Sequence, residues 1–167
     1  MRVLPPLHQK RRKSMLKPVA IITSLEDSPP TIDRSLLGAY LQTVYRVNDP
    51  PGFAFFPGKH LPAEAADWLF RRRVGSWAFL TAWNPRSAVL SAVENRRRNK
   101  QLSGALQNGG WPYYSGVGIG AGETWSPEES FWILDIPAER AIQLGRQFDQ
   151  NALVWWTEGK PVELWWL

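Results

Sequence analysis

The chain of 167 residues contains no cysteine and only two histidines, His8 and His60. The absence of cysteine excludes disulfide bonds, thiolate catalysis and zinc or iron–sulfur sites held by cysteine. A two-histidine metal site would have to recruit the N-terminal tail, so we expect no metal. No stretch approaches the ~18 apolar residues of a membrane span, and the basic N-terminus lacks the continuous apolar core of a signal peptide. We therefore expect a cytoplasmic protein without a membrane partner.

The positive charge is concentrated at the N-terminus. The net charge is +5, and residues 1–31 contribute +4 of it, because six basic residues there stand against only two acidic ones. Five prolines in the same segment make a packed fold unfavourable. The sequence predicts a disordered basic leader over residues 1–31, dispensable for folding, and a single α+β domain over residues 32–167. The run Lys10–Lys13 would allow contact with nucleic acid, but the nearly neutral domain does not favour it.

Hydrophobic periodicity and turn residues predict the elements of the domain. We expect helices at 36–41, 62–74, 91–108 and 137–148, and strands at 43–47, 53–56, 76–83, 111–117, 130–136, 152–156 and 162–166. Between residues 76 and 156 the order is strand, helix, strand, strand, helix, strand, which is the split β-α-β order of ferredoxin-like folds. The expected fold class is α+β: a two-layer sandwich with a ferredoxin-like core and an extra hairpin at each end.

The strand that ends before Asn84-Pro85 is the expected centre of the sheet. It is a continuous apolar run, which is typical of a strand buried on both faces. Ser91 and Glu94 form a capping box at the start of the next helix, and Gly109-Gly110 ends it. We expect the C-terminal end of the strand to face the first turns of this helix.

Polar residues stand where a packed domain normally has apolar ones. Asn95 and Asn99 lie one helical turn apart, on a stripe that becomes apolar at Leu102. Buried amides and carboxylates are costly unless paired, so these residues predict either a closed structural network or a ligand site. The candidate ligand-binding residues are Asn84, Asn95, Arg98, Asn99, Glu128, Glu129, Ser130, Gln150 and Asn151.

Glu128 and Glu129 stand at the entrance of a strand, where alternation sends their side chains to opposite faces. One of them is then able to face the asparagines of the long helix. Paired acids can bind a divalent metal or act as acid and base, although a structural role is favoured. The sequence contains no recognisable nucleophile with an activating base, so it assigns no catalytic residue and no cofactor.

Two further patterns have ordinary explanations. Residues 116–121 match the G-x-G-x-x-A fingerprint of dinucleotide sites, but no helix start follows, so a flexible flap is favoured. The ten tryptophans predict core filling or oligomerisation rather than stacking on bases. One member of each pair Trp155-Trp156 and Trp165-Trp166 is expected outside the main core, because neighbours on a strand face opposite sides. The oligomeric state is not defined by the sequence.

Several of these motifs, taken in order, resemble the uncharacterised bacterial domain-of-unknown-function 3293 family. They are Thr81-Ala82-Trp83-Asn84-Pro85, the helix with Glu94-Asn95, Arg98-Asn99 and Leu102, then Glu128-Glu129-Ser130-Phe131, and Gln150-Asn151-Ala152. The similarity covers roughly residues 36–156 and excludes the leader. Asp149 departs from the family pattern, which has Gly before Gln-Asn. The family implies no established activity, but it supports reading the polar groups as one constellation.

Two functions follow from these residues. The first is a binding or regulatory module whose amide-rich pocket holds a small polar ligand such as a nucleotide or nucleobase, since amides offer donors and acceptors without titrating near neutral pH. The alternative is a nucleic-acid- or nucleotide-processing enzyme, with Glu128 or Glu129 as base or metal ligand and Arg98 stabilising phosphate charge.

Overall fold

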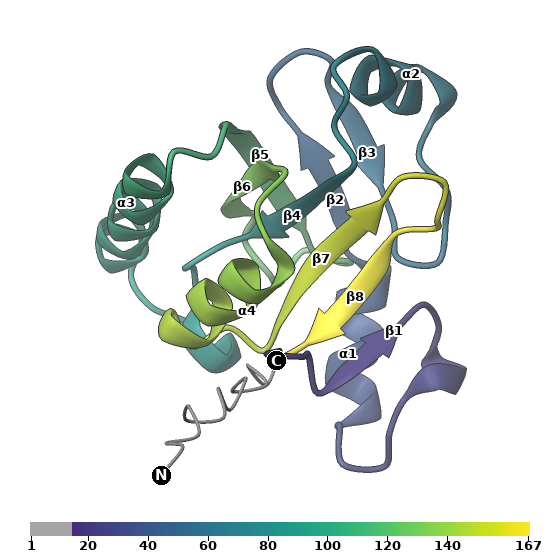
Figure 1. Ribbon diagram of the computed structural model, residues 1–167. Coiled ribbons are helices and arrows are strands. Elements are labelled where there is room, and N and C mark those ends of the chain that lie inside the picture. The colour runs from purple at the N-terminus through teal and green to yellow at the C-terminus, as the bar shows by residue number, and fades with distance from the viewer. Residues whose placement is uncertain (1–14) are drawn as a thin grey trace, which may run out of the picture.

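The computed structural model describes residues 15–167, which form one eight-stranded antiparallel sheet with four α-helices (Figure 1). The strand order is β1-β8-β7-β4-β6-β5-β2-β3. The strands are β1 (Ala20–Ile22), β2 (Val44–Val47), β3 (Phe53–Phe55), β4 (Ser76–Leu80), β5 (Tyr113–Ile119), β6 (Glu128–Leu134), β7 (Ala152–Thr157) and β8 (Glu163–Trp166). The helices are α1 (Arg34–Gln42), α2 (Ala63–Arg71), α3 (Ala92–Gly109) and α4 (Ala138–Gln147), with 3-10 turns η1 (Leu25–Asp27) and η2 (Pro85–Ser87). Within this part of the chain, no helix is long and apolar enough to cross a membrane.

β4 is the central strand, as its apolar run predicts. It pairs with β6 on one side and β7 on the other, and Trp77 lies opposite both Leu134 and Trp156. The four side chains from Trp77 to Leu80 are each at most 4% exposed. The helix that follows is also confirmed, because the Ser91 hydroxyl accepts from the Glu94 amide at 3.2 Å and Gly110 ends α3 with φ of 76°.

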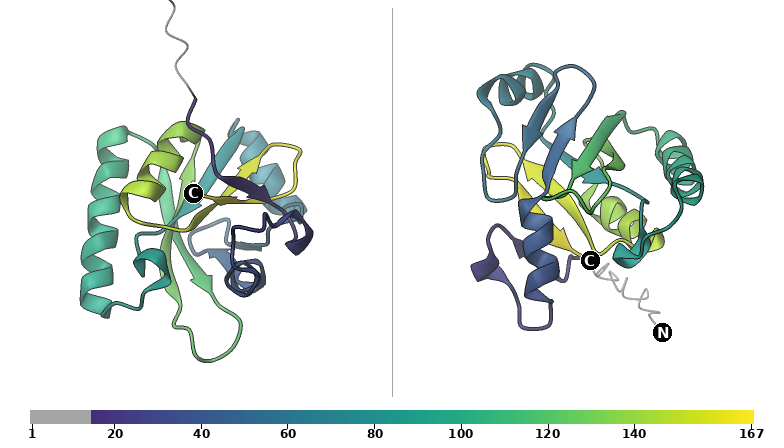
Figure 2. Two further views of the ribbon diagram at one scale, coloured as in Figure 1. Left: turned by 90° about the horizontal axis from the view of Figure 1, so that it is seen from below. Right: turned by 180° about the vertical axis from the view of Figure 1, so that it is seen from behind.

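Each face of the sheet carries its own apolar core. α3 and α4 cover one face, and α1 lies on the other, as two perpendicular views show (Figures 1 and 2). The core under α3 and α4 contains Ala78, Leu80, Leu102, Leu106, Ile133, Ile142 and Leu153. The core on the opposite face contains Leu37 of α1 and Leu69 of α2, packed with Tyr45, Phe55, Trp77, Phe79, Trp132, Val154 and Trp156.

The sheet is curved into a half-barrel around the aromatic core. The rings of Phe55 in β3 and Trp77 in β4 have centroids 4.8 Å apart, although three strands lie between β3 and β4. In a flat sheet those two strands would be about 19 Å apart, at ~4.8 Å per strand. Phe53 of β3 likewise contacts Trp132 of β6, with centroids 5.3 Å apart. The aromatic face is therefore the concave one.

This architecture shows that the expected two-layer, ferredoxin-like sandwich is wrong. The predicted order of elements from residue 76 to residue 157 is observed, and so are both hairpins. The hairpins, however, do not decorate a separate core: they continue one sheet that curls over its second face. The physical reason is that the central strands are apolar on both faces, so a sandwich with one wet face would leave large aromatic side chains in water.

Curvature also explains where the tryptophan pairs lie. Trp155 and Trp165 stack under the α4 side with centroids 4.5 Å apart, while Trp156 stacks on Trp77 in the concave core at 6.0 Å. Trp155, Trp156 and Trp165 are all at most 7% exposed. Trp155 and Trp156 therefore point to opposite faces, as expected, but neither is left to cover a tail or a partner, because each face of the sheet has its own core.

The segment assigned to a disordered leader reaches the sheet. β1 pairs with β8, with Ile21 opposite Trp165, and Ile22 is completely buried in the concave core. The boundary at residue 32 is therefore wrong for residues 20–22. A three-residue strand is too short for periodicity to reveal, and its neighbour β8 lies at the other end of the chain. Residues 1–14, with the basic run Lys10–Lys13, lie outside the described residues.

We predict that Ile22→Ala lowers the free energy of unfolding by about 2–5 kcal/mol, because it opens a cavity in a packed core. Ile21→Ala is the matched control on the same strand. Its side chain is 51% exposed, so the change should stay within about 0.5 kcal/mol. Urea unfolding of both variants checks this. Equal small effects would show that β1 is not integral to the fold and that the leader is dispensable after all.

Candidate functional site

Side-chain amides of α3 hold the backbone that follows β4. The Asn99 Oδ1 accepts from the Ala82 amide at 2.9 Å, and its Nδ2 donates to the Glu129 carbonyl at 2.8 Å. One turn earlier, Asn95 Oδ1 accepts from the Asn84 amide and its Nδ2 donates to Asn84 Oδ1, both at 2.8 Å. Asn95 and Asn99 are 2% and 4% exposed. The side-chain oxygen and nitrogen of both asparagines are therefore already hydrogen-bonded within the fold.

Arg98 and Gln150 complete this support from the neighbouring elements. Arg98 Nε donates to the Ala82 carbonyl at 2.8 Å, and its Nη2 donates to the Phe148 carbonyl at 2.6 Å. Gln150 Nε2 donates to the carbonyls of Trp83 and Phe148 at 3.1 and 3.2 Å. Arg98 thus joins the loop after β4 to the end of α4, which is a structural task.

The loop after β4 contains several residues whose backbone is in the left-handed region. Asn84, Arg86 and Ser87 have φ values of 44°, 53° and 59°. Each such non-glycine residue costs roughly 1–3 kcal/mol and persists only where the surrounding structure holds it, often at functional sites. Asp149 also has a left-handed backbone, with φ of 54°. Its carbonyl accepts a hydrogen bond from the Arg86 amide at 2.8 Å. That conformation favours glycine, so Asp149 is one more strained residue that the surrounding structure holds.

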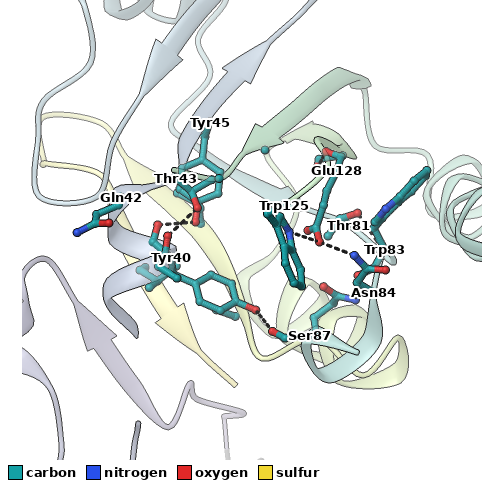
Figure 3. A pocket seen from close by; sticks show the side chains of 18 of the residues that line it. Tyr40, Gln42, Thr43, Tyr45, Thr81, Trp83, Asn84, Ser87, Trp125 and Glu128 are labelled. Atoms are coloured by element: carbon teal, nitrogen blue, oxygen red, sulfur yellow. Dashed lines mark hydrogen bonds between the residues drawn. The ribbon is translucent and has the colours of Figure 1, made fainter. Parts of the chain in front are cut away.

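A cavity of about 310 Å³ lies beside this loop, on the concave side of the sheet (Figure 3). Its floor is apolar and includes Phe79, Val154 and Leu164, which belong to the concave core. Exposed residues Ala39 and Thr124 stand on its rim, so it opens to solvent. The hydroxyl, amide and carboxyl side chains around it are those of Tyr40, Gln42, Thr43, Tyr45, Thr81, Asn84, Ser87, Thr124, Glu128, Ser130 and Gln150.

Glu128 is the acidic group of the cavity. Its Oε1 accepts from Asn84 Nδ2 and from the Trp125 indole N–H, each at 3.0 Å (Figure 3). Burial raises the pKa of Glu128, and these two hydrogen bonds offset part of the rise. No lysine, arginine or histidine is among the residues that line the cavity in the described chain. The electrostatics of the site are therefore those of one half-buried carboxyl group.

A second polar group lies across the cavity from Glu128. The Tyr40 hydroxyl and the Ser87 Oγ are hydrogen-bonded at 3.3 Å, and Asn151 Nδ2 donates to them at 3.4 and 3.1 Å. Burial raises the pKa of Tyr40. The hydroxyl pair is therefore neutral at physiological pH, and it offers one hydroxyl hydrogen that is not shared between the two.

The nine predicted site residues divide into two sets. Asn84, Glu128, Ser130 and Gln150 line the cavity. The other five do not: Asn95, Arg98 and Asn99 support the loop from behind, Asn151 holds the hydroxyl pair, and the Glu129 side chain is exposed while its carbonyl accepts from Thr81 Oγ1 at 2.6 Å. The opposite orientation of Glu128 and Glu129 follows the expected strand alternation.

Sequence reasoning missed several cavity residues, among them Tyr40, Ser87 and Trp125. Ser87 follows the Asn84-Pro85 turn, and Trp125 lies in the segment between β5 and β6, close to Glu128 in the sequence. Their closeness to predicted site residues could therefore have indicated both. Tyr40 comes from α1, far from the other groups in sequence, and only the fold brings it to Ser87.

The G-x-G-x-x-A pattern serves the sheet and the flap. Residues 116–119 continue β5, and the chain then turns into β6 rather than into a helix. A Cβ on Gly116 would lie 2.4 Å from the Phe79 ring, so glycine is needed for packing there. Among residues 15–167, no group of three His, Asp or Glu side chains is arranged to hold a metal.

Comparison with known families agrees with the motifs. Residues 80–153 match the model of the family described as "Protein of unknown function (DUF3293)". The resemblance is confirmed, over a shorter stretch than residues 36–156. The matched region runs from the end of β4 to the start of β7 and contains all nine candidate residues, whereas Tyr40 lies outside it. No curated protein and no solved structure matches the chain.

We predict that Asn95→Ala destabilises the protein by about 1–3 kcal/mol, because the buried Asn84 amide loses its acceptor. Arg96→Ala, on the exposed side of the same helix turn, is the control and should change stability by less than about 0.5 kcal/mol. Denaturant unfolding measures both. If Asn95→Ala leaves stability unchanged, the network does not hold the loop.

The raised pKa of Glu128 predicts a pH-dependent stability difference. A carboxyl group whose pKa is higher in the folded state than the ordinary value of 4.5 binds more protons when folded. Its favourable contribution is present below the unfolded pKa and is lost as pH rises through the folded pKa. Glu128→Gln removes this dependence and keeps an acceptor oxygen, so the variant should gain stability relative to wild type as pH rises above the ordinary value of 4.5. Unfolding free energies across that range check it, and a difference that is constant with pH contradicts it.

Proposed function

We propose that this protein is a binding or regulatory module that holds a small polar organic molecule in the cavity beside the loop after β4. The proposal rests on the separation of the polar residues around that loop into two sets. One set of polar residues is consumed in shaping a strained backbone, and a second set faces an open cavity with an apolar floor. An apolar pocket with a few convergent polar groups and a shifted pKa is the usual form of a small-molecule site.

The charge of the cavity limits the chemical classes of ligand that fit it. Phosphate is normally met by arginine, lysine or a helix N-terminus. Here Glu128 is the charged lining group, and Arg98 already donates to two backbone carbonyls. We therefore favour an uncharged or cationic ligand, such as a nucleobase or nucleoside, over a nucleotide whose phosphate would enter the cavity.

The enzymatic alternative receives less support. It requires Arg98 beside phosphate, with Glu128 or Glu129 as base or metal ligand. Glu128 lines the cavity, but Arg98 lies behind the loop and donates to two backbone carbonyls. Glu128 has no activated nucleophile among its hydrogen-bond partners, which are an amide and an indole.

A melting-temperature screen of the full chain tests the proposal. The panel holds uncharged bases and nucleosides, organic amines and nucleotides. At about 100 times Kd, a ligand should raise Tm by roughly 5 °C or more. Ala39→Trp fills the rim of the cavity and should abolish that shift.

Ala63→Trp is the matched control, because Ala63 is also an exposed alanine in a helix, α2, and does not line the cavity. It should leave the shift intact. A panel without any shift, or a shift that survives Ala39→Trp, would count against binding at this site.

A further inference from the structure

The indole of Trp125 occupies the cavity beside Glu128. In Figure 3 its ring stands between Glu128 on one side and the Tyr40–Ser87 pair on the other, with the indole N–H directed at the carboxylate. Trp125 is half-buried and belongs to the β5–β6 flap, residues 120–127. The protein thus fills part of its own site with a flat aromatic ring that carries an N–H donor.

The flap that carries Trp125 is weakly tied down. It contains no regular element, Gly122 has φ of 88°, and residues 121–124 are exposed. In the described chain, the indole-to-Glu128 bond is the one side-chain hydrogen bond made by residues 120–127. Segments with so few buried contacts open at low free energy. Displacement of the ring therefore requires breaking one hydrogen bond and little packing.

Two acceptor oxygens of the cavity have no hydrogen-bond partner among the described residues. Both hydrogen bonds of the Glu128 carboxylate fall on Oε1, so Oε2 has no partner among the described residues. Gln150 donates both of its bonds through Nε2, which leaves Oε1 available. The hydroxyls of Tyr45, Thr81 and Ser130 already donate to backbone carbonyls. A ligand that pairs with these two oxygens must supply donors.

We propose that the ligand is a planar heteroaromatic ring with two adjacent N–H donors, which displaces the Trp125 indole and pairs with both oxygens of Glu128. This rests on the proposed function and specifies its ligand class. Two adjacent N–H groups match a carboxylate as the fork of an arginine does. The guanine edge, with its ring N–H and exocyclic amine, has this form. The Trp125 indole itself shows that a flat ring with an N–H donor fits beside Glu128.

Calorimetric titration of the full chain with guanosine, inosine and guanosine 5′-monophosphate tests the inference. Inosine keeps the ring and its N–H but lacks the amine, so guanosine should bind about tenfold more tightly, the value of one hydrogen bond to a charged group. The phosphate of the nucleotide should not improve the affinity. Glu128→Gln, which has one acceptor oxygen in place of two, should bring the guanosine-to-inosine ratio close to one.

Trp125→Phe tests whether the indole of the flap competes with the ligand for the Glu128 carboxylate. It keeps an aromatic ring but removes the N–H that occupies Glu128, so guanosine should bind about tenfold more tightly than to wild type. Trp111→Phe, a half-buried tryptophan outside the cavity, is the control and should leave the affinity unchanged. Circular dichroism of each variant confirms folding.

The outcomes separate the two proposals. Equal binding of guanosine and inosine, tighter binding of the nucleotide, or no gain in Trp125→Phe overturns the ligand class. If guanosine does not bind but another panel compound does, and Ala39→Trp blocks it, the ligand class fails while the proposed function stands. If nothing binds to wild type or to Trp125→Phe, the proposed function fails too.

Discussion

The structure depends on burying an aromatic sheet on both of its faces. The strands β4, β6 and β7 carry large apolar side chains on both faces of the sheet. The helices α3 and α4 cover only one of these faces. The sheet therefore curls, so that the edge strand β3 reaches the rings of its own centre. Closing the concave side in this way fixes the position of α1 and brings the β5–β6 flap near it. Those two segments and the end of β4 then surround a space that the core does not fill.

The loop after β4 shows how local strain and buried polarity are coupled. Three left-handed residues in four positions would be unstable in isolation, and the amides of Asn95 and Asn99 stabilise them by pairing with the backbone. Asparagine suits this task because one side chain both donates and accepts. The polar stripe of α3 is consequently an internal scaffold. Its effect on the cavity is indirect, through the placement of Asn84 and Ser87.

The cavity differs from a phosphate site in the sign and number of its charges. Glu128 is a single half-buried carboxyl group, and burial raises its pKa. Its neighbours are uncharged, and one of them is the indole of Trp125. A carboxylate of this kind recognises donors on a flat ring better than it recognises anions. The flap and the carboxyl group of Glu128 are thus joined by one side-chain hydrogen bond.

The sequence by itself determined the order and type of most elements, the central place of β4, the capped α3 and the inward direction of Asn95 and Asn99. These follow from periodicity and local capping, which act over a few residues. Tertiary structure decided the rest: the curvature of the sheet, the pairing of β1 with β8, and the separation of the predicted site into a scaffold and a cavity. Such features depend on how two faces are covered and on contacts between distant segments, as with Tyr40 and Ser87. No local pattern encodes them, because their free energy arises only when the whole sheet closes.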